Sequence, residues 1–202
     1  MLEFELIGLT GPSGVGKDYT ARQLQFAGFT HLKFANGLRH LTYAIHGLEF
    51  SRMGDKDYES AELPHLGYTV TDLLIQVGAQ ARDLEPNVFC HTLVWQMWHK
   101  PIRLNHRGWV ISDVRQPNEL DVIQQADGTV YRVQRDTVAR PPAALDKMLD
   151  HLELPVLWSG TVPQGLHPCS MPTPVPTEAL LDLYDYIGHP DPYRLLTYLE
   201  AF

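Results

Sequence analysis

The chain has 202 residues, 44% of them hydrophobic and 20% charged, and its formal net charge is −8. This length and composition suit one α/β domain with a full hydrophobic core. No apolar run approaches the ~20 residues that span a bilayer, and the negative charge argues against a broad nucleic-acid-binding face. We therefore expect neither a membrane nor a nucleic-acid polymer as a partner. The acidic start is unlike a signal peptide, and Cys90 and Cys169 lie far apart, so we expect a cytoplasmic protein with reduced thiols.

An apolar run over 4–9 predicts a buried strand, and a glycine-rich loop follows it. Gly11, Gly16 and Lys17 match the phosphate-binding pattern G-x-x-x-x-G-K, with Asp18 where Ser or Thr is usual. Small residues let backbone N–H groups turn toward phosphate oxygens, and the following helix adds its positive dipole end. The alternative is a tight turn that is rich in glycine for steric reasons only. The pattern predicts an ATP or GTP site held by Gly11, Ser13, Gly14, Val15, Gly16, Lys17 and Asp18.

The rest of the chain alternates between helix and strand patterns. Helices are predicted over 17–27, 35–45, 71–84, 87–98, 118–126, 177–187 and 192–199, strands over 30–34, 109–114 and 129–133, and a long loop over 49–67. This alternation predicts a parallel sheet of about five strands with right-handed crossovers and helices on both faces.

Three apolar residues lead to Ser112 and Asp113 at the carboxyl end of a predicted strand, beside the expected position of the loop. A carboxylate there can hold Mg²⁺ through water. The alternative is an ordinary strand-end or capping aspartate. Asp18 is the second candidate metal ligand, and its alternative is a first-turn acid that favours the helix dipole.

Asp113-Val114-Arg115-Gln116-Pro117-Asn118-Glu119 resembles a motif of phage deoxynucleoside monophosphate kinases. Four further segments resemble the same family in the same order: 16–18, 34–39, 73–82 and 130–135. The resemblance covers most of residues 5 to 136. The chain departs from the family pattern at Ala79, where Thr is more common, and at Asp136, where Pro usually stands. Residues 154–176 have no counterpart.

The resemblance implies a three-layer P-loop NTPase fold in one kinase domain. Its core would comprise about 1–34, 107–134 and 177–202, with a helical acceptor-binding insertion over 35–105 and a lid over 135–170. It also implies transfer of the ATP γ-phosphoryl group to a deoxynucleoside monophosphate (dNMP), with Mg²⁺ as cofactor, in the cytoplasm of a phage-infected bacterium. A homodimer is left open.

The resemblance and the chemistry of phosphoryl transfer together suggest roles for charged side chains. The catalytic candidates are Lys17, Asp113, Arg115 and Arg135, and the acceptor-binding candidates are Arg39, Gln76, Arg82, Arg115 and Arg140. Three of these have structural alternatives: Arg39 as an exposed helix-face charge, Gln76 as a helical contact, and Arg82 as a surface ion pair with Asp83 or Glu85.

Two other functions remain compatible with the sequence. One is another small-molecule P-loop kinase, similar to dephospho-CoA kinase. The other is a nucleotide-binding regulatory or assembly protein that hydrolyses ATP slowly or not at all. ADP release that depends on an added monophosphate would separate the kinase from the binding protein.

Overall fold

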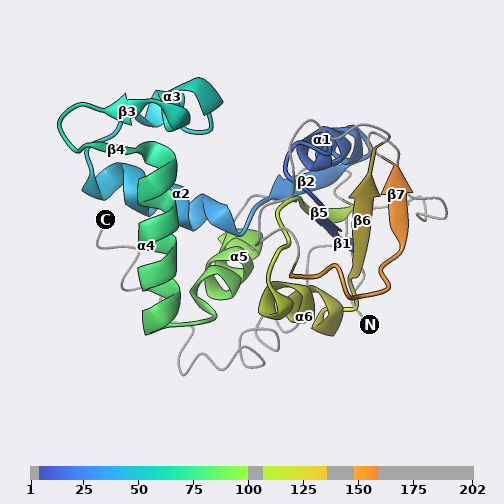
Figure 1. Ribbon diagram of the computed structural model, residues 1–202. Coiled ribbons are helices and arrows are strands. Elements are labelled where there is room, and N and C mark those ends of the chain that lie inside the picture. Colours follow the sequence, from blue (N-terminus) through green and yellow to red (C-terminus); the bar gives the residue numbers. More distant parts are fainter. Residues whose placement is uncertain (1–4, 100–106, 136–147, 159–202) are drawn as a thin grey trace.

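The computed structural model describes residues 5–99, 107–135 and 148–158, and it contains a five-stranded sheet with helices packed against it (Figure 1). The core elements are β1 (Glu5–Thr10), α1 (Lys17–Phe26), β2 (Phe29–Leu32), α5 (Val88–His99), β5 (Gly108–Ile111), α6 (Pro117–Gln125), β6 (Thr129–Gln134) and β7 (Val156–Trp158). Between β2 and α5 lie α2 (Ala35–Ile45), the 3-10 turn η1 (Phe50–Arg52), α3 (Lys56–Ser60), β3 (Glu62–Leu63), β4 (Tyr68–Thr69) and α4 (Val70–Leu84). Within these described residues, no helix combines the length and apolar character that crossing a membrane requires.

The five strands lie in the order β2-β5-β1-β6-β7, and every neighbouring pair is parallel. Ile7 of the central strand β1 is level with Val110 of β5 on one side and with Thr129 of β6 on the other. The chain first builds the β2 and β5 side and then crosses to the β6 side. The carboxyl end of β1 is therefore the switch point at which open α/β sheets bind ligands.

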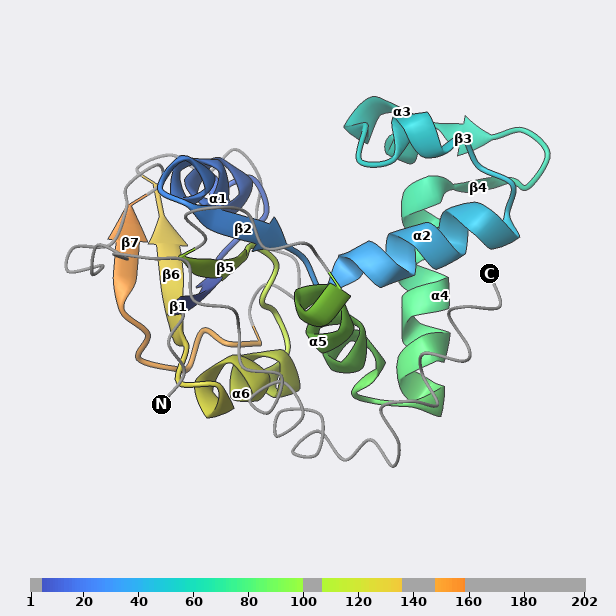
Figure 2. The same ribbon diagram turned by 180° about the vertical axis from the view of Figure 1, so that it is seen from behind.

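Successive strand residues point to opposite faces of the sheet and build two separate clusters. On one face, Ile7 and Leu9 pack with Ala21 and Leu24 of α1. The cluster on the other face contains Leu6 with side chains from α5 and α6, among them Leu93, Val94, Leu120 and Ile123. Figures 1 and 2 show α1 and α6 on opposite sides of the sheet. The predicted α/β fold with a central parallel sheet between helix layers is confirmed, and it is consistent with a P-loop NTPase-like fold.

Helices α2, α3 and α4 form a lobe beside the sheet, together with the antiparallel pair β3 and β4 (Figure 2). The prediction of a long loop over 49–67 is wrong in part, because η1, α3 and β3 lie within this range. Asp55 begins α3 by accepting hydrogen bonds from the backbone N–H groups of Asp57 and Tyr58. Leu63 of β3 is buried in the core of the lobe. These elements have only five or two residues each, so their sequence carries too little periodicity to reveal them.

The fifth strand comes from the range expected for the lid, 135–170. Val156–Trp158 pair with β6, and Leu157 is level with Val133 and buried in the cluster under α1. This strand has three residues, of which only the middle one is buried. It is too short for an alternating hydrophobic pattern to be recognised in the sequence. The remaining lid residues 136–147 and 159–170, and the helices predicted over 177–187 and 192–199, lie outside the described residues.

Candidate functional site

The loop between β1 and α1, residues 11–16, has a backbone that favours glycine at three positions. Gly11, Gly14 and Gly16 have φ angles of +132°, +82° and +105°, in the region that side chains rarely adopt. At Gly11, a Cβ atom would also lie 2.8 Å from the carbonyl oxygen of Val133 in β6. The glycines of the motif therefore allow the positive φ angles that this loop requires. We call residues 11–16 the phosphate loop.

Lys17 is the first residue of α1, and its side chain folds back over the phosphate loop. Nζ donates hydrogen bonds to the carbonyl oxygens of Gly11 at 2.5 Å and Pro12 at 2.9 Å. Val15 is buried against the sheet, whereas Ser13 is exposed on the loop. Val15 thus anchors the loop to the core, and the ammonium group of Lys17 lies against the loop. This arrangement suits the binding of an anion.

Asp18 lies in a hydrogen-bonded network that joins α1, β2 and β5. Its Oδ1 accepts a 2.6 Å hydrogen bond from the hydroxyl of Ser112, and Nζ of Lys33 lies 2.8 Å from both carboxylate oxygens. The Nε2 atom of His31 is 2.7 Å from the Ser112 hydroxyl. Burial opposes ionisation, but the hydrogen bonds from Lys33 and Ser112 outweigh it and hold the pKa of Asp18 below its ordinary value. Asp18 is therefore an ionised carboxylate directly beside Lys17.

Asp113 connects the end of β5 to the beginning of α2. Its Oδ1 and Oδ2 accept hydrogen bonds, each of 2.9 Å, from the backbone N–H groups of Phe34 and Ala35. This is the contact expected from the capping alternative. Burial raises the pKa of Asp113, although these two hydrogen bonds and the charges of Lys33 and Arg115 favour the ionised form. A role of Asp113 in metal binding stays a prediction.

The oxygen donors beside the phosphate loop suit Mg²⁺. The Asp18 side chain is 58% exposed, and each oxygen of Asp113 has a second lone pair beyond the one that accepts a backbone N–H. Mg²⁺ bound together with nucleotide phosphates uses one or two protein carboxylates and keeps several waters. In residues 5–99, 107–135 and 148–158, no group of three or more His, Cys, Asp or Glu could hold a metal ion. The donors present thus fit an ion shared with phosphates.

Arg115 follows the end of β5, and the buried Glu119 fixes its backbone. Oε2 of Glu119 accepts hydrogen bonds from the backbone N–H groups of Arg115 at 2.8 Å and Gln116 at 3.0 Å. Burial, together with the negative charge of Asp113, raises the pKa of Glu119 to about 7. Arg115 lies close enough to Asp113 for its positive charge to favour the ionised carboxylate. A cation, two carboxyl groups and the phosphate loop therefore gather at one edge of the sheet.

The arginines expected to bind the acceptor from α2 and α4 are both paired with buried carboxylates. Arg39 donates a hydrogen bond to Oε1 of Glu59, which also accepts one from the backbone N–H of Gly54 at 2.9 Å. Arg82 lies 3.9 Å from Oε1 of Glu119, and its guanidinium group covers the ring of Phe89 at 4.6 Å. The partner of Arg82 thus comes from α6 and not from the acids next to it in sequence.

The other candidate residues are more widely spread. Gln76 is exposed on α4, Arg135 is exposed directly after β6, and Arg140 lies outside the described residues. The structure brings one group together at the carboxyl ends of β1 and β5: the phosphate loop, Lys17, Asp18, Asp113 and Arg115. The remaining described candidates stand on the lobe or at the end of β6: Arg39, Gln76, Arg82 and Arg135.

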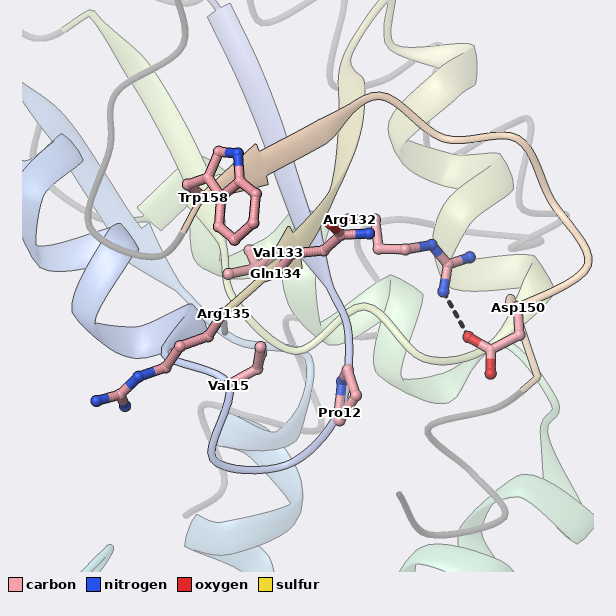
Figure 3. A pocket seen from close by; sticks show the side chains of 8 residues that line it. All are labelled: Pro12, Val15, Arg132, Val133, Gln134, Arg135, Asp150 and Trp158. Atoms are coloured by element: carbon pink, nitrogen blue, oxygen red, sulfur yellow. Dashed lines mark hydrogen bonds and ion pairs between the residues drawn. The ribbon is translucent and has the colours of Figure 1, made fainter. Parts of the chain in front are cut away.

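A cavity of about 240 Å³ opens beside the phosphate loop (Figure 3). Its lining comes from the loop, β6, β7 and the turn before β7: Pro12, Val15, Arg132, Val133, Gln134, Arg135, Asp150 and Trp158. Arg132 forms an ion pair with Asp150 and donates a 2.6 Å hydrogen bond to the carbonyl oxygen of Leu149, which fixes this turn. Figure 3 shows the ring of Trp158 at the end of β7 and the side chain of Arg135 pointing away from Asp150.

Four residues of this region had no role predicted from the sequence: His31, Lys33, Ser112 and Glu119. Two signals in the sequence point to three of them. His31 and Lys33 are two residues apart near the end of a predicted strand and so share a face. Gln116 and Glu119 have the spacing of a helix capping box, which the structure contains.

Comparison with known proteins gives a viral relative that matches much of the chain. No protein-family model matches the chain. The chain is 30% identical over 149 residues to a protein of Acanthamoeba polyphaga mimivirus named "Putative deoxynucleotide monophosphate kinase". The match covers 66% of this chain and 76% of the viral protein. The chain therefore belongs to the nucleotide kinase family of this viral relative.

Proposed function

We propose that this protein is a deoxynucleoside monophosphate kinase that transfers the γ-phosphoryl group of ATP to a dNMP, giving dNDP and ADP. One observation carries the proposal: the phosphate loop, the buried ammonium group of Lys17 and the carboxylate of Asp18 meet at the switch point of a parallel sheet. The name of the mimivirus relative supports the choice of substrate.

In this reaction an oxygen of the acceptor phosphate bonds to the γ-phosphorus while the bond from that phosphorus to the β–γ bridging oxygen breaks, and ADP leaves. Such transfers depend on positioning and on neutralising negative charge. The N–H groups of the phosphate loop and Lys17 bind the donor phosphates, and Arg115 binds the acceptor phosphate from the end of β5. Asp18, and Asp113 through water, would hold Mg²⁺, which when bound neutralises charge on the β- and γ-phosphates.

The cavity in Figure 3 suits the base of ATP. Its volume of about 240 Å³ is below the ~300–1,000 Å³ of sites that enclose whole small-molecule ligands, so it fits part of a nucleotide. Pro12 and Val15 belong both to the phosphate loop and to the cavity lining, so a nucleoside attached to bound phosphates can reach it. The half-exposed ring of Trp158 offers an aromatic face on which a base can stack.

The lobe within 35–105 binds the dNMP in this proposal, through Arg39, Gln76 and Arg82. A guanidinium group has five donors, so Arg39 and Arg82 can keep their carboxylate partners and still bind a phosphate or a base. Arg135, which follows β6 and lines the cavity, is the described candidate for binding the transferred phosphoryl group, and Arg140 lies outside the described residues. Arg115 lies close enough to Asp113 for their charges to interact, so it is the first choice for the acceptor phosphate.

A coupled assay of ADP release tests the proposal. ATP and Mg²⁺ are held constant while each dNMP, each ribonucleoside monophosphate and dephospho-CoA is added in turn, with Lys17→Ala as the inactive control. We expect ADP release that depends on at least one dNMP and is lost in the control. Release with dephospho-CoA alone would assign a different small-molecule kinase, and ATP binding without acceptor-dependent release would indicate a nucleotide-binding protein.

A further inference from the structure

Lys33 lies between β2 and α2, and its ammonium group is bound to Asp18. Nζ is 2.8 Å from both oxygens of the carboxylate, while the Ser112 hydroxyl donates to Oδ1. The Lys33 side chain is 30% exposed, and that of Asp18 is 58% exposed. The cation thus covers both oxygens of a carboxylate that solvent still reaches.

Asp18 directly follows Lys17, so a metal ion bound with the donor phosphates would meet this carboxylate first. An ammonium group and a divalent cation repel each other when both bind one carboxylate, because like charges at contact distance are costly even in a polar environment. Ser112 is a neutral donor and adds no such repulsion. A metal ion at Asp18 must therefore displace Lys33 or share the carboxylate with it at a cost.

We propose that Lys33 competes with the divalent cation for Asp18 and so sets the Mg²⁺ concentration at which the nucleotide site is filled. This inference rests on the proposed function, since it assumes that Asp18 meets the metal ion of a bound nucleotide. Lys33 is here a tuning residue of the metal site: it contacts the metal ligand and not the reacting atoms.

Binding of a fluorescent, non-hydrolysable ATP analogue tests the proposal without turnover. The analogue is held at one concentration, and Mg²⁺ is titrated against the wild-type protein and Lys33→Met. We expect Lys33→Met to reach half of its Mg²⁺-dependent binding at an about three- to tenfold lower Mg²⁺ concentration, as when a like charge is removed beside a partly exposed site. Lys33→Arg keeps the charge and should behave as wild type, and Lys56→Met is the matched control for a lost exposed lysine.

A double-mutant cycle asks whether the effect passes through Asp18. In an Asp18→Asn background, Lys33→Met should no longer lower the Mg²⁺ requirement. An equal shift in both backgrounds would mean that Lys33 acts on the nucleotide directly, and the proposal would be wrong. Lys33→Gln, neutral but polar, gives the same comparison should Lys33→Met fail to fold.

Failure of this proposal is distinguishable from failure of the proposed function. An unchanged or higher Mg²⁺ requirement in Lys33→Met, with normal dNMP-dependent ADP release in the wild type, overturns only the competition. Analogue binding by the wild type that is independent of Mg²⁺ also overturns it, since no divalent cation then reaches Asp18. Absence of dNMP-dependent ADP release, with Mg²⁺-dependent binding intact, overturns the kinase assignment and leaves the competition standing.

Discussion

Oδ2 of Asp113 accepts a 2.9 Å hydrogen bond from the backbone N–H of Ala35, and this contact joins the end of β5 to the first residue of α2. The same carboxylate is one of the two candidate Mg²⁺ ligands, together with Asp18. A single side chain thus links the lobe of α2 and α4 to the edge of the sheet where the phosphate loop begins.

Asp113→Asn should therefore impair both stability and metal use. The amide group replaces one acceptor oxygen by a donor that faces a backbone N–H, which should cost about 1–3 kcal/mol of unfolding free energy. We also expect lower turnover and a higher Mg²⁺ concentration for half-maximal rate. Urea denaturation and Mg²⁺-dependent rates measure the two effects, with exposed Asp121→Asn as the control. Lost stability with unchanged Mg²⁺ dependence would leave Asp113 with its capping role alone.

Lys17→Ala should leave the protein folded but nearly inactive. A lost charge-assisted phosphate contact that strengthens in the transition state costs ~3–4 kcal/mol, or a few hundredfold in rate. Circular dichroism and steady-state kinetics test the two parts. A folded variant that keeps more than about a tenth of wild-type turnover would contradict the assignment of the phosphate loop.

Arg115→Ala should separate acceptor use from donor binding. Because Arg115 lies beside Asp113, we expect the KM for dNMP to rise or turnover to collapse, while ATP affinity without acceptor stays within a few-fold of wild type. Kinetics with varied dNMP and equilibrium binding of ATP provide the comparison, and exposed Arg22→Ala of α1 is the control. An equal loss of ATP affinity would move Arg115 to the donor site or to the fold.

Arg39→Ala should destabilise the lobe, because it leaves the carboxylate of Glu59 buried without its cation. Breaking a buried ion pair costs roughly 3–5 kcal/mol, and the partial exposure of Arg39 reduces this to about 2 kcal/mol. Glu59→Gln in the same chain should restore part of the lost stability. Thermal denaturation of the two single variants and the double variant tests this, and additive losses would show that the two side chains are not coupled.

Glu119 should make stability depend on pH. Its pKa is about 7 in the folded protein against an ordinary value of 4.5, mainly because it is buried, so the folded state binds its proton more tightly than the unfolded chain. Stability from this group is present at low pH and is lost as pH rises from about 4.5 to about 7, by at most about 3 kcal/mol. Urea denaturation at pH 5 and pH 7.5 should show a smaller difference for Glu119→Gln than for wild type. Equal differences would mean that Glu119 titrates normally.

The phosphate loop and the class of fold can be predicted from local features of the sequence. Gly11, Gly16 and Lys17 are close in the chain, and each of the two glycines meets a local backbone demand, a positive φ, that any surrounding structure must respect. The apolar strands also reveal the parallel sheet, since residues buried on both faces form short continuous hydrophobic runs. Such local patterns can be recognised without knowing which residues are neighbours in the folded protein.

Which charged side chains pair with one another depends on how the chain packs in three dimensions. Ser112 lies 94 residues from Asp18. Glu119 of α6 is paired with Arg82 of α4, whereas the structural alternative for Arg82 was an ion pair with a neighbour in sequence. A sequence contains many arginines and many acidic residues, and one arginine or one acid cannot be told from another by its chemistry. Which of them pair depends on how the helices and strands pack. The fifth strand, β7, also depends on the packing of the chain. Its three residues are too few to show a strand pattern in the sequence, and they form a strand because they pair with the edge of β6.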